Sequence, residues 1–365
     1  MKKFSSSHIA QIGTAATAIA AVLAIGIGTA GTSAATTTEE LAHVIESGLE
    51  QPAADVILNG PSTWSVPVGN GPSSDSFLPA FAYGLFNPDI APPGANDWNC
   101  TPEDGQEPVV LIHGTWENAY DNWAYMSPTL KSAGLCVYAL NYGKLPIGDG
   151  GGLGDIVPGA NGNGDIAQSA GQLAMFVDRV LASTGSTKVN LVGHSQGGLM
   201  ARQYLKFNGG ADKVDNLVTL GATNHGTTLL GIGTLGRTIN NLGIDVLGPV
   251  ALVVGVAGIQ QVYDSEFLET LNADGDTVPG VDYTVIGTRY DEITTPYAST
   301  FLTAGPGAKV DNITLQDGCE IDTSDHLSMN YSPRAASITA RAVGGRTNDG
   351  RPVPIVCEPN AWLFG

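Results

Sequence analysis

The chain has 365 residues and a formal net charge of −19, with 35 acidic residues against 16 basic ones. A surface this acidic repels phosphate backbones, so we expect no nucleic-acid partner. It also repels anionic headgroups, so any contact with lipid has to come from apolar patches. The length is sufficient for one large α/β domain with a sizeable core.

Residues 1–35 have the layout of a secretory signal peptide. Two lysines precede a charge-free run from Phe4 to Thr38, whose middle is apolar and whose small residues suit cleavage after Ala34 or Ala35. An N-terminal membrane anchor is the alternative, but this Gly- and Thr-rich stretch makes a poor spanning helix. We therefore expect a secreted, extracellular protein, in which removal of the two lysines brings the net charge near −21.

The four cysteines suggest two disulfides in an exported chain, with three possible pairings. We favour Cys100–Cys136 and Cys319–Cys357, because each pair closes a loop of about forty residues near one end of the domain. A metal site is the alternative, and it is weak because no two cysteines have the C-x-x-C spacing.

The chain divides into an arm and a large domain. Residues 36–105 are rich in Pro, Gly, Asn and Ser, which predicts an extended arm with one short helix at Glu39–Leu49. Residues 106–365 are expected to form the large domain, in which regular structure begins at Pro108 and a Gly-rich loop extends from Gly143 to Gly164. The expected elements are strand Val109–His113, helix Asn118–Ala133, strand Leu135–Leu140, helix Asp165–Ser183, strand Lys188–Val192, helix Gly197–Phe207, strands Val214–Leu220, Tyr283–Gly287 and Val310–Leu315, and helix Pro333–Ala342. This alternation predicts an α/β fold with a mostly parallel sheet covered by helices on both faces.

An apolar insertion interrupts the alternation at about residues 226–262. Its core, Leu242–Ile259, reads LGIDVLGPVALVVGVAGI and is long enough to raise the question of a membrane span. Asp245, Pro249 and several glycines argue against a span in lipid, so we expect one or two short cap helices over one end of the sheet. A cap this apolar needs something apolar to cover or to touch.

The stretch Gly193-His194-Ser195-Gln196-Gly197 lies between an expected strand and an expected helix. This is G-x-S-x-G in the strand–turn–helix context that gives the motif its meaning. The serine then occupies a strained turn at the positive end of the helix dipole. A plain Gly-rich turn is the alternative, since isolated matches are common by chance. The motif predicts a nucleophilic serine, provided that a base lies within reach.

The order of the remaining residues selects a base and an acid. In α/β folds whose nucleophile lies in G-x-S-x-G, the catalytic residues follow in the order Ser, then Asp or Glu, then His. Only His225 and His326 lie beyond Ser195. Asp291 lies just past an expected strand, and His326 lies in SDHLS before the last helix, so Ser195, Asp291 and His326 satisfy order and context together. Glu292 is the alternative acid. His225 precedes every strand that could supply an acid, so we interpret it as a lining residue or a satisfied loop histidine.

Acyl transfer also requires donors for the oxyanion. We predict the backbone N–H of Gln196, which follows the serine, and that of Thr115, in the HGTW turn directly after VVLI. The hydroxyl of Thr115 can add a third donor. A simple tight turn is the alternative for HGT. We expect His113 and His194 to be structural.

Five motifs, namely HGTW, GHSQGG, TNHGT, RYDEITTP and SDHLSM, together resemble the secreted class 2 triacylglycerol lipases of actinobacteria and, more distantly, the fungal lipase B type. The resemblance extends from about Asn99 to about Pro333. It implies an α/β-hydrolase fold, a Ser–Asp–His triad and esterase or lipase activity without a cofactor. Carried over by motif, these roles fall on the triad and oxyanion residues already assigned.

The same resemblance bears on finer features. In the fungal relative a Thr follows the oxyanion-loop glycine and a Gln follows the serine, and Thr115 and Gln196 match both. Cys100 and Cys136 also resemble a disulfide of that relative. Some bacterial lipases hold a structural calcium near the catalytic histidine; Asp322 and Asp325 suggest one here, but no clear second pair of ligands is found.

The sequence thus predicts a secreted lipase, expected to be monomeric, that cleaves acylglycerols at an oil–water interface. An esterase for short or polymeric esters is the alternative within enzymes. A non-catalytic hydrolase-fold protein that binds lipid is the alternative from another class.

Overall fold

The computed structural model describes residues 60–228, 231 and 250–363. Within them a seven-stranded sheet has the order β1-β3-β2-β4-β5-β6-β7. Strand β1 pairs antiparallel with β3, and every other neighbouring pair is parallel, which confirms the predicted mostly parallel sheet. The strands are β1 Thr63–Ser65, β2 Val109–Ile112, β3 Val137–Lys144, β4 Val189–His194, β5 Val214–Leu220, β6 Asp282–Gly287 and β7 Lys309–Thr314.

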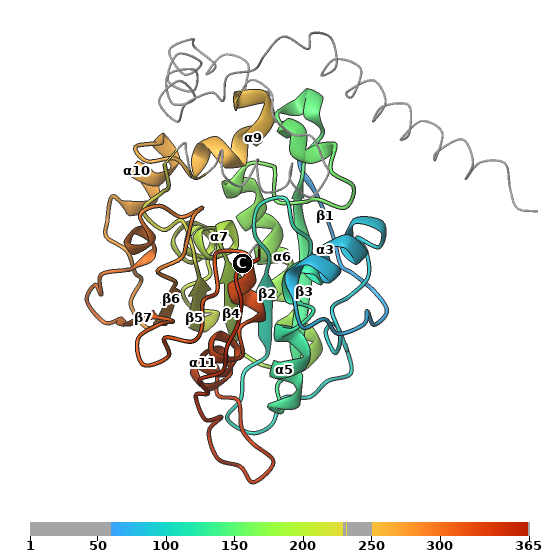
Figure 1. Cartoon of the computed structure of the whole chain (residues 1–365), viewed down its shortest axis with the longest axis vertical. Coiled ribbons are helices and arrows are strands. Elements are labelled where there is room, and N and C mark those ends of the chain that lie inside the picture. The colour runs from blue at the N-terminus through green and yellow to red at the C-terminus, as the bar shows by residue number, and fades with distance from the viewer. Residues whose placement is uncertain (1–59, 229–230, 232–249, 364–365) are drawn as a thin grey trace, which may run out of the picture.

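Helices lie on both faces of this sheet (Figure 1). They are α3 Phe77–Phe86, α4 Ala119–Trp123, α5 Met126–Ser132, η2 Ile147–Asp149, η3 Gly152–Asp155, α6 Ile166–Thr184, α7 Gln196–Phe207, α9 Val250–Gln260, α10 Glu266–Asn272, η4 Tyr297–Thr300, η5 Ser328–Tyr331 and α11 Pro333–Ala342.

Alternation along the strands divides the core into two layers. In β2, Val110 and Ile112 pack with the apolar face of α6 and with α7, whereas Val109 and Leu111 pack with α4, α5 and α11. All four side chains are fully buried. A strand buried on both faces reads as a continuous apolar run, which is why VVLI was recognisable as the centre of a parallel sheet.

The elements differ from expectation in several places, since α10 was not predicted and η2 and η3 lie in the expected Gly-rich loop. The helix expected over Asn118–Ala133 is split into α4 and α5, and α4 begins with a capping box between Asn118 and Asp121. The segment expected as an extended arm contains β1 and α3. Its helix buries Phe77, Ala80, Phe81 and Gly84 on one face, and Pro79 lies in the first turn, where proline is tolerated.

Several expectations fall on residues outside the described ranges: the signal peptide at 1–35, the helix at Glu39–Leu49 and much of the cap. The described end of the cap is α9, which is interrupted by a backbone kink at Gly255, where φ is 65°. Among the described residues, no helix combines the length and apolarity needed to cross a membrane.

Two disulfides, Cys100–Cys136 and Cys319–Cys357, tie the described part of the chain, and they are the pairing favoured from the sequence. The first joins the segment after α3 to the residue that precedes β3. The second joins the loop after β7 to the C-terminal segment beyond α11.

Candidate active site

Ser195 lies between the end of β4 and the start of α7, with φ 52° and ψ −124°. This positive φ is a strained conformation for a residue other than glycine. The neighbouring glycines make the turn possible. A Cβ on Gly197 would lie 2.2 Å from the carbonyl oxygen of Ile112, and one on Gly193 would lie 2.5 Å from the amide nitrogen of Gly198. The G-x-S-x-G sequence therefore forms a sharp strand-to-helix turn, because only glycine fits where α7 crosses back over the sheet.

The imidazole of His326 is bonded to the carboxylate of Asp291. Nδ1 of His326 lies 2.9 Å from both carboxylate oxygens, and each side chain is only 1% exposed. The backbone N–H groups of Ile293 and Thr294 donate to Oδ1 of Asp291 at 3.0 and 2.6 Å, which fixes the carboxylate. Glu292, the alternative acid, instead accepts from the backbone N–H of His326 at 3.4 Å. The geometry thus favours Asp291 as the partner of the imidazole.

The fold brings Ser195 beside this pair through its neighbour His194. The rings of His194 and His326 lie 4.9 Å apart, and Nε2 of His194 is 3.0 Å from the carbonyl oxygen of His326. Since Nδ1 of His326 faces Asp291, Nε2 is the atom left for the serine. The hydrogen bonds among the described residues do not include one between Ser195 and His326. Such bonds are often long in ligand-free enzymes and tighten when substrate binds.

Gly221 is a site residue that sequence reasoning missed. It follows β5 with φ 54°, and a Cβ there would lie 3.1 Å from Oδ2 of Asp291, from Nδ1 of His326 and from Sδ of Met329. A side chain at this position would therefore press on the imidazole–carboxylate pair. Its position directly after a strand, at the edge where β4 delivers Ser195, was the available signal.

Carboxylates dominate the electrostatics around the imidazole. Burial favours the neutral ring, but the charge of Asp291, followed by those of Glu292 and Glu117, raises the pKa of His326 to about 9. Burial, together with repulsion from Asp325, raises the pKa of Glu292 to about 7. The site is thus arranged to stabilise an imidazolium, which is the charge that a general base acquires when it takes a proton.

The expected oxyanion donors lie in a braced turn. The hydroxyl of Thr115 accepts from Nε2 of Gln261 at 2.9 Å, so its own hydrogen can point elsewhere. The side chain of Gln196 donates to the carbonyl of Gly162 and accepts from the hydroxyl of Tyr142, both at 3.0 Å. These contacts hold the backbone of both residues near Ser195. Gln261, at the base of the cap, was not anticipated from the sequence.

The other histidines have structural contacts. His225 lies between Asp276, 2.9 Å from its Nε2, and the carbonyl of Ser299, 3.0 Å from its Nδ1, as expected of a satisfied loop histidine. His113 is fully buried and contacts the carbonyl of Gly114 at 2.8 Å. Burial lowers the pKa of His113 to about 4, so it stays neutral.

The two aspartates considered as calcium ligands both accept hydrogen bonds from serine hydroxyl groups. Asp322 accepts from the hydroxyl of Ser332 at 2.6 Å, and Asp325 accepts from the hydroxyl of Ser328 at 2.6 Å. In the part of the chain that the structure describes, no group of three or more His, Cys, Asp or Glu side chains is placed to hold a metal ion.

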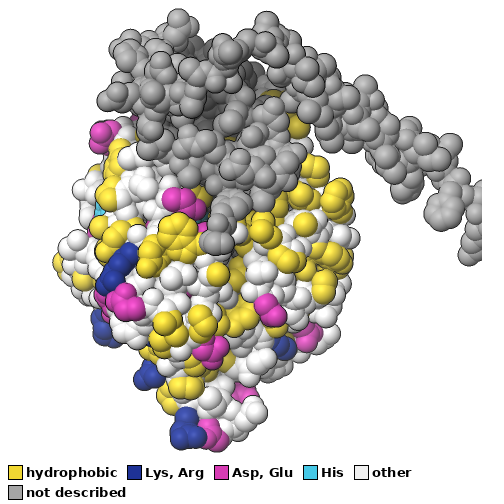
Figure 2. All heavy atoms as spheres, viewed as in Figure 1, with side chains coloured by type: hydrophobic (Ala, Val, Ile, Leu, Met, Phe, Trp, Pro, Cys, Tyr) yellow, Lys and Arg dark blue, Asp and Glu magenta, His cyan; other side chains and the backbone are white. Residues whose placement is uncertain are grey.

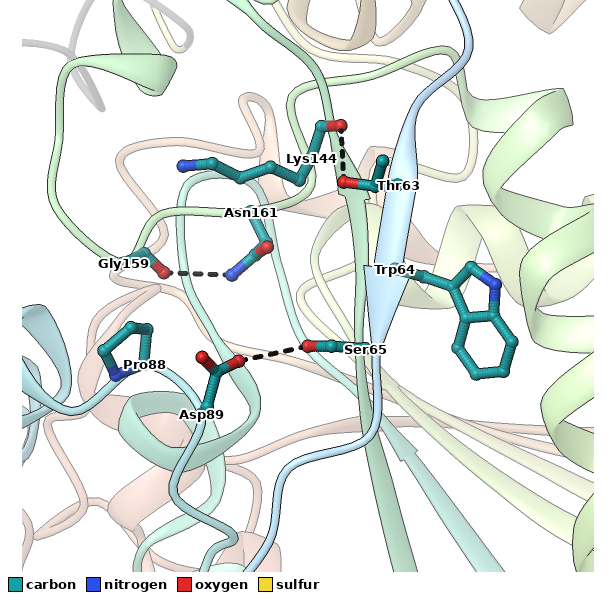
Figure 3. A pocket seen from close by; sticks show the side chains of 8 residues that line it. All are labelled: Thr63, Trp64, Ser65, Pro88, Asp89, Lys144, Gly159 and Asn161. Atoms are coloured by element: carbon teal, nitrogen blue, oxygen red, sulfur yellow. Dashed lines mark hydrogen bonds between the residues drawn. The ribbon is translucent and has the colours of Figure 1, made fainter.

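A cavity of about 220 Å³ lies against the Gly-rich loop, but none of its lining residues belongs to the triad or the oxyanion turn (Figure 3). Its wall includes a hydrogen bond from Ser65 to Asp89 and the ends of β1 and β3. The ring of Trp64 points away from the other labelled side chains, and it packs edge-on against Phe176 of α6. The cavity therefore lies between residues of the 36–105 segment and the edge of the sheet at β3.

Comparison with known proteins agrees with this geometry. Residues 106–330 match the family model described as "Lipase (class 2)". The chain belongs to the class 2 lipase family. Triacylglycerol lipases from Pseudarthrobacter phenanthrenivorans and Burkholderia plantarii are each 29% identical to it over 245 residues. The match spans 65% of this chain, and 67% and 60% of those two proteins.

Among solved structures, Aspergillus fumigatus lipase B is similar with a TM-score of 0.54 and 21% identity, over 93% of this chain and 83% of that one. This likeness shows the fold. The class 2 lipase chain has the α/β-hydrolase fold expected from its sequence, and its family is one of ester hydrolases.

Proposed function

We propose that this class 2 lipase is a secreted enzyme that hydrolyses acylglycerols through an acyl-enzyme on Ser195. One observation supports this most strongly. Ser195 lies on a strained strand-to-helix turn, the elbow (residues 193–197). The ring of the preceding His194 is 4.9 Å from that of His326, and Nδ1 of His326 is bonded to the buried carboxylate of Asp291. The order of these residues in the chain, their burial and the hydrogen bond between the imidazole and the carboxylate support the three roles. Ser195 is then the nucleophile, His326 the base and Asp291 the group that orients the base.

The mechanism uses only the side chains and backbone of this site. His326 takes the proton of Ser195, and the resulting alkoxide attacks the ester carbonyl. The backbone N–H groups of Thr115 and Gln196 stabilise the oxyanion, and Asp291 stabilises the imidazolium. His326 then donates the proton to the leaving alcohol. Water repeats the sequence to release the fatty acid and free Ser195, so no step calls for a cofactor.

An exposed apolar surface in the described part of the chain supports a lipid substrate. Exposed apolar side chains occur on α3 and on the loop after β3, among them Tyr83, 38% exposed, Phe86, 81%, and Ile156, 44%. The loop packs on α3, since a Cβ on Gly159 would lie 2.9 Å from the carbonyl oxygen of Gly84. Figure 2 shows apolar side chains spread over the visible face, this part included, and basic side chains mainly toward its left and lower edges. An acidic protein can reach an uncharged oil surface through such a patch.

Secretion is part of the proposal. The N-terminal sequence has the layout of a signal peptide, and the two disulfides suit an oxidising compartment. We further expect the mature enzyme to act as a monomer.

Two assays test this function. Ser195→Ala is expected to lower kcat on a p-nitrophenyl ester by roughly 10⁴–10⁶-fold, and a variant that keeps most of its turnover contradicts the assignment. A profile of rates from tributyrin to long-chain emulsions then separates lipase from esterase. Turnover restricted to soluble short esters favours the esterase alternative.

A further inference from the structure

A second buried carboxylate–imidazole pair, Glu117 and His194, lies next to the first, with the rings of His194 and His326 4.9 Å apart. Oε2 of Glu117 is 3.0 Å from Nδ1 of His194 and accepts from the backbone N–H of Gly114 at 2.9 Å. The side chains of His194 and Glu117 are 0% and 4% exposed. This one carboxylate oxygen therefore joins the residue before Ser195 to the residue before Thr115.

The other ring nitrogen of His194 reaches the triad. Its Nε2 lies 3.0 Å from the carbonyl oxygen of His326. A carbonyl only accepts hydrogen bonds, so Nε2 must carry a proton. A single imidazole thus connects three segments that are distant in the sequence: the oxyanion turn, the elbow and the loop that holds His326.

We propose that Glu117 and His194 act as a positioning pair that sets the oxyanion donor and the catalytic imidazole against Ser195. Neither side chain touches the reacting atoms in this scheme. The carboxylate holds the peptide between His113 and Gly114, directly before the peptide whose N–H is the Thr115 donor, and the imidazole holds the backbone of His326. This inference rests on the proposed function and adds residues that order and motif did not supply.

The chemistry of Glu117 indicates more than packing. Its second oxygen, Oε1, is buried without a hydrogen-bond partner among the described residues. A buried carboxylate with an unpaired oxygen is costly, and an apolar side chain would serve packing better. Burial disfavours the charge, yet His194 lowers the pKa of Glu117 below its usual value, so the carboxylate stays ionised. This carboxylate faces Nδ1 of His194, which also lies 2.9 Å from Nδ2 of Asn122.

Glu117→Gln is the informative substitution, because it keeps the shape and removes the charge. A neutral imidazole carries only one N–H, so with a neutral amide at this position the contacts to Gly114, to Nδ1 of His194 and from Nε2 to the carbonyl of His326 cannot all be hydrogen bonds. Displacing an oxyanion donor costs up to about 10²–10³ in kcat when the donor is lost outright, and we expect about 10–10²-fold here. KM should change less than about threefold. Affinity for an alkyl boronic acid, which mimics the tetrahedral intermediate, should fall in parallel with kcat.

The matched control is Asp121→Asn, a nearby buried carboxyl that caps α4 through the backbone of Asn118 and contacts neither Gly114 nor His194. It should lower the melting temperature with little change in kcat or in boronic acid affinity. A merely structural Glu117 would behave in the same way, with stability lost and both kinetic readouts kept, and that result overturns the proposal.

A double-mutant cycle and a measurement on the wild-type enzyme complete the test. If the pair acts as a unit, His194→Asn combined with Glu117→Gln should cost no more than the larger single effect, whereas additive losses contradict it. Should the variants fail to fold, ¹⁵N NMR of histidine in the wild-type enzyme decides, since Nε2 of His194 must be protonated; an unprotonated Nε2 refutes the scheme. Fluorophosphonate labelling of wild-type Ser195 serves as a separate control, because its absence would count against the proposed function rather than against the pair.

Discussion

The pH dependence of ester hydrolysis follows from the carboxylates that surround His326. The general base must be neutral to accept the serine proton, and the neighbouring charges raise the pKa of His326 to about 9. Below that pKa the neutral fraction rises about tenfold per pH unit. We therefore expect kcat/KM to increase steadily from pH 6 toward an alkaline plateau. If the base were a histidine with an ordinary pKa of about 6.5, kcat/KM would already reach its plateau near pH 7.5.

Glu292 allows the cause of this shift to be tested. Its charge is the second contribution, after Asp291, that raises the pKa of His326. Glu292→Gln keeps an acceptor for the backbone N–H of His326 and removes the charge. A charge within about 4–6 Å shifts a pKa by roughly 1–3 units, and this partly exposed carboxylate belongs at the lower end, so the apparent pKa should fall by about one unit.

The assay is the initial rate on a soluble p-nitrophenyl ester between pH 5 and 10, corrected for spontaneous hydrolysis at each pH. kcat/KM reports the pKa values of the catalytic groups in the free enzyme. A wild-type pH profile of kcat/KM with its midpoint at or below 6.5 would refute the claim that neighbouring carboxylates raise the pKa of His326. A Glu292→Gln profile unchanged from wild type would refute the contribution assigned to Glu292.

Three further expectations concern the triad, the apolar surface and a disulfide. Asp291→Asn should lower kcat by about 10⁴-fold while the protein stays folded, because the imidazole loses the group that sets its tautomer; near-normal rates would exclude Asp291 as the acid. Phe86→Ser should leave hydrolysis of soluble esters unchanged, since this side chain is 81% exposed, and should weaken adsorption to triolein emulsions. A variant that matches the wild-type rate on the emulsion as well as on the soluble ester would show that this residue of α3 is not part of the interfacial surface. Replacing Cys319 and Cys357 together by Ser should lower the free energy of unfolding by about 3–4 kcal/mol in denaturant titrations, and an unchanged midpoint would show that this link contributes nothing.

Much of the fold could be predicted from local sequence patterns. The central strand β2 was recognisable because it is a short apolar run. Helices α6 and α11 began at or near the predicted residues, with Asp165 and Ser332 as caps. The elbow was recognisable because glycine, serine and glycine stand between a strand and a helix. Position in the chain relative to strand ends then brought Asp291 and His326 into consideration.

Features that depend on distant contacts were not accessible in this way. Strand β1 is three residues long and exists through its pairing with β3, about eighty positions later in the chain. Glu117 reads as an ordinary polar residue after HGTW, because its partner His194 is 77 positions away. Gln261 gains its meaning only when the base of the cap meets Thr115. Tertiary packing, rather than local preference, selects such residues.

The central claim is that Ser195 becomes nucleophilic because His326 removes its proton. Mass spectrometry of the enzyme after treatment with a fluorophosphonate tests this directly. The account predicts one adduct per chain, on the peptide that contains Ser195, and labelling that is slowed at least about 10³-fold in His326→Ala. An adduct on another residue, or equal labelling rates in the two proteins, would contradict it.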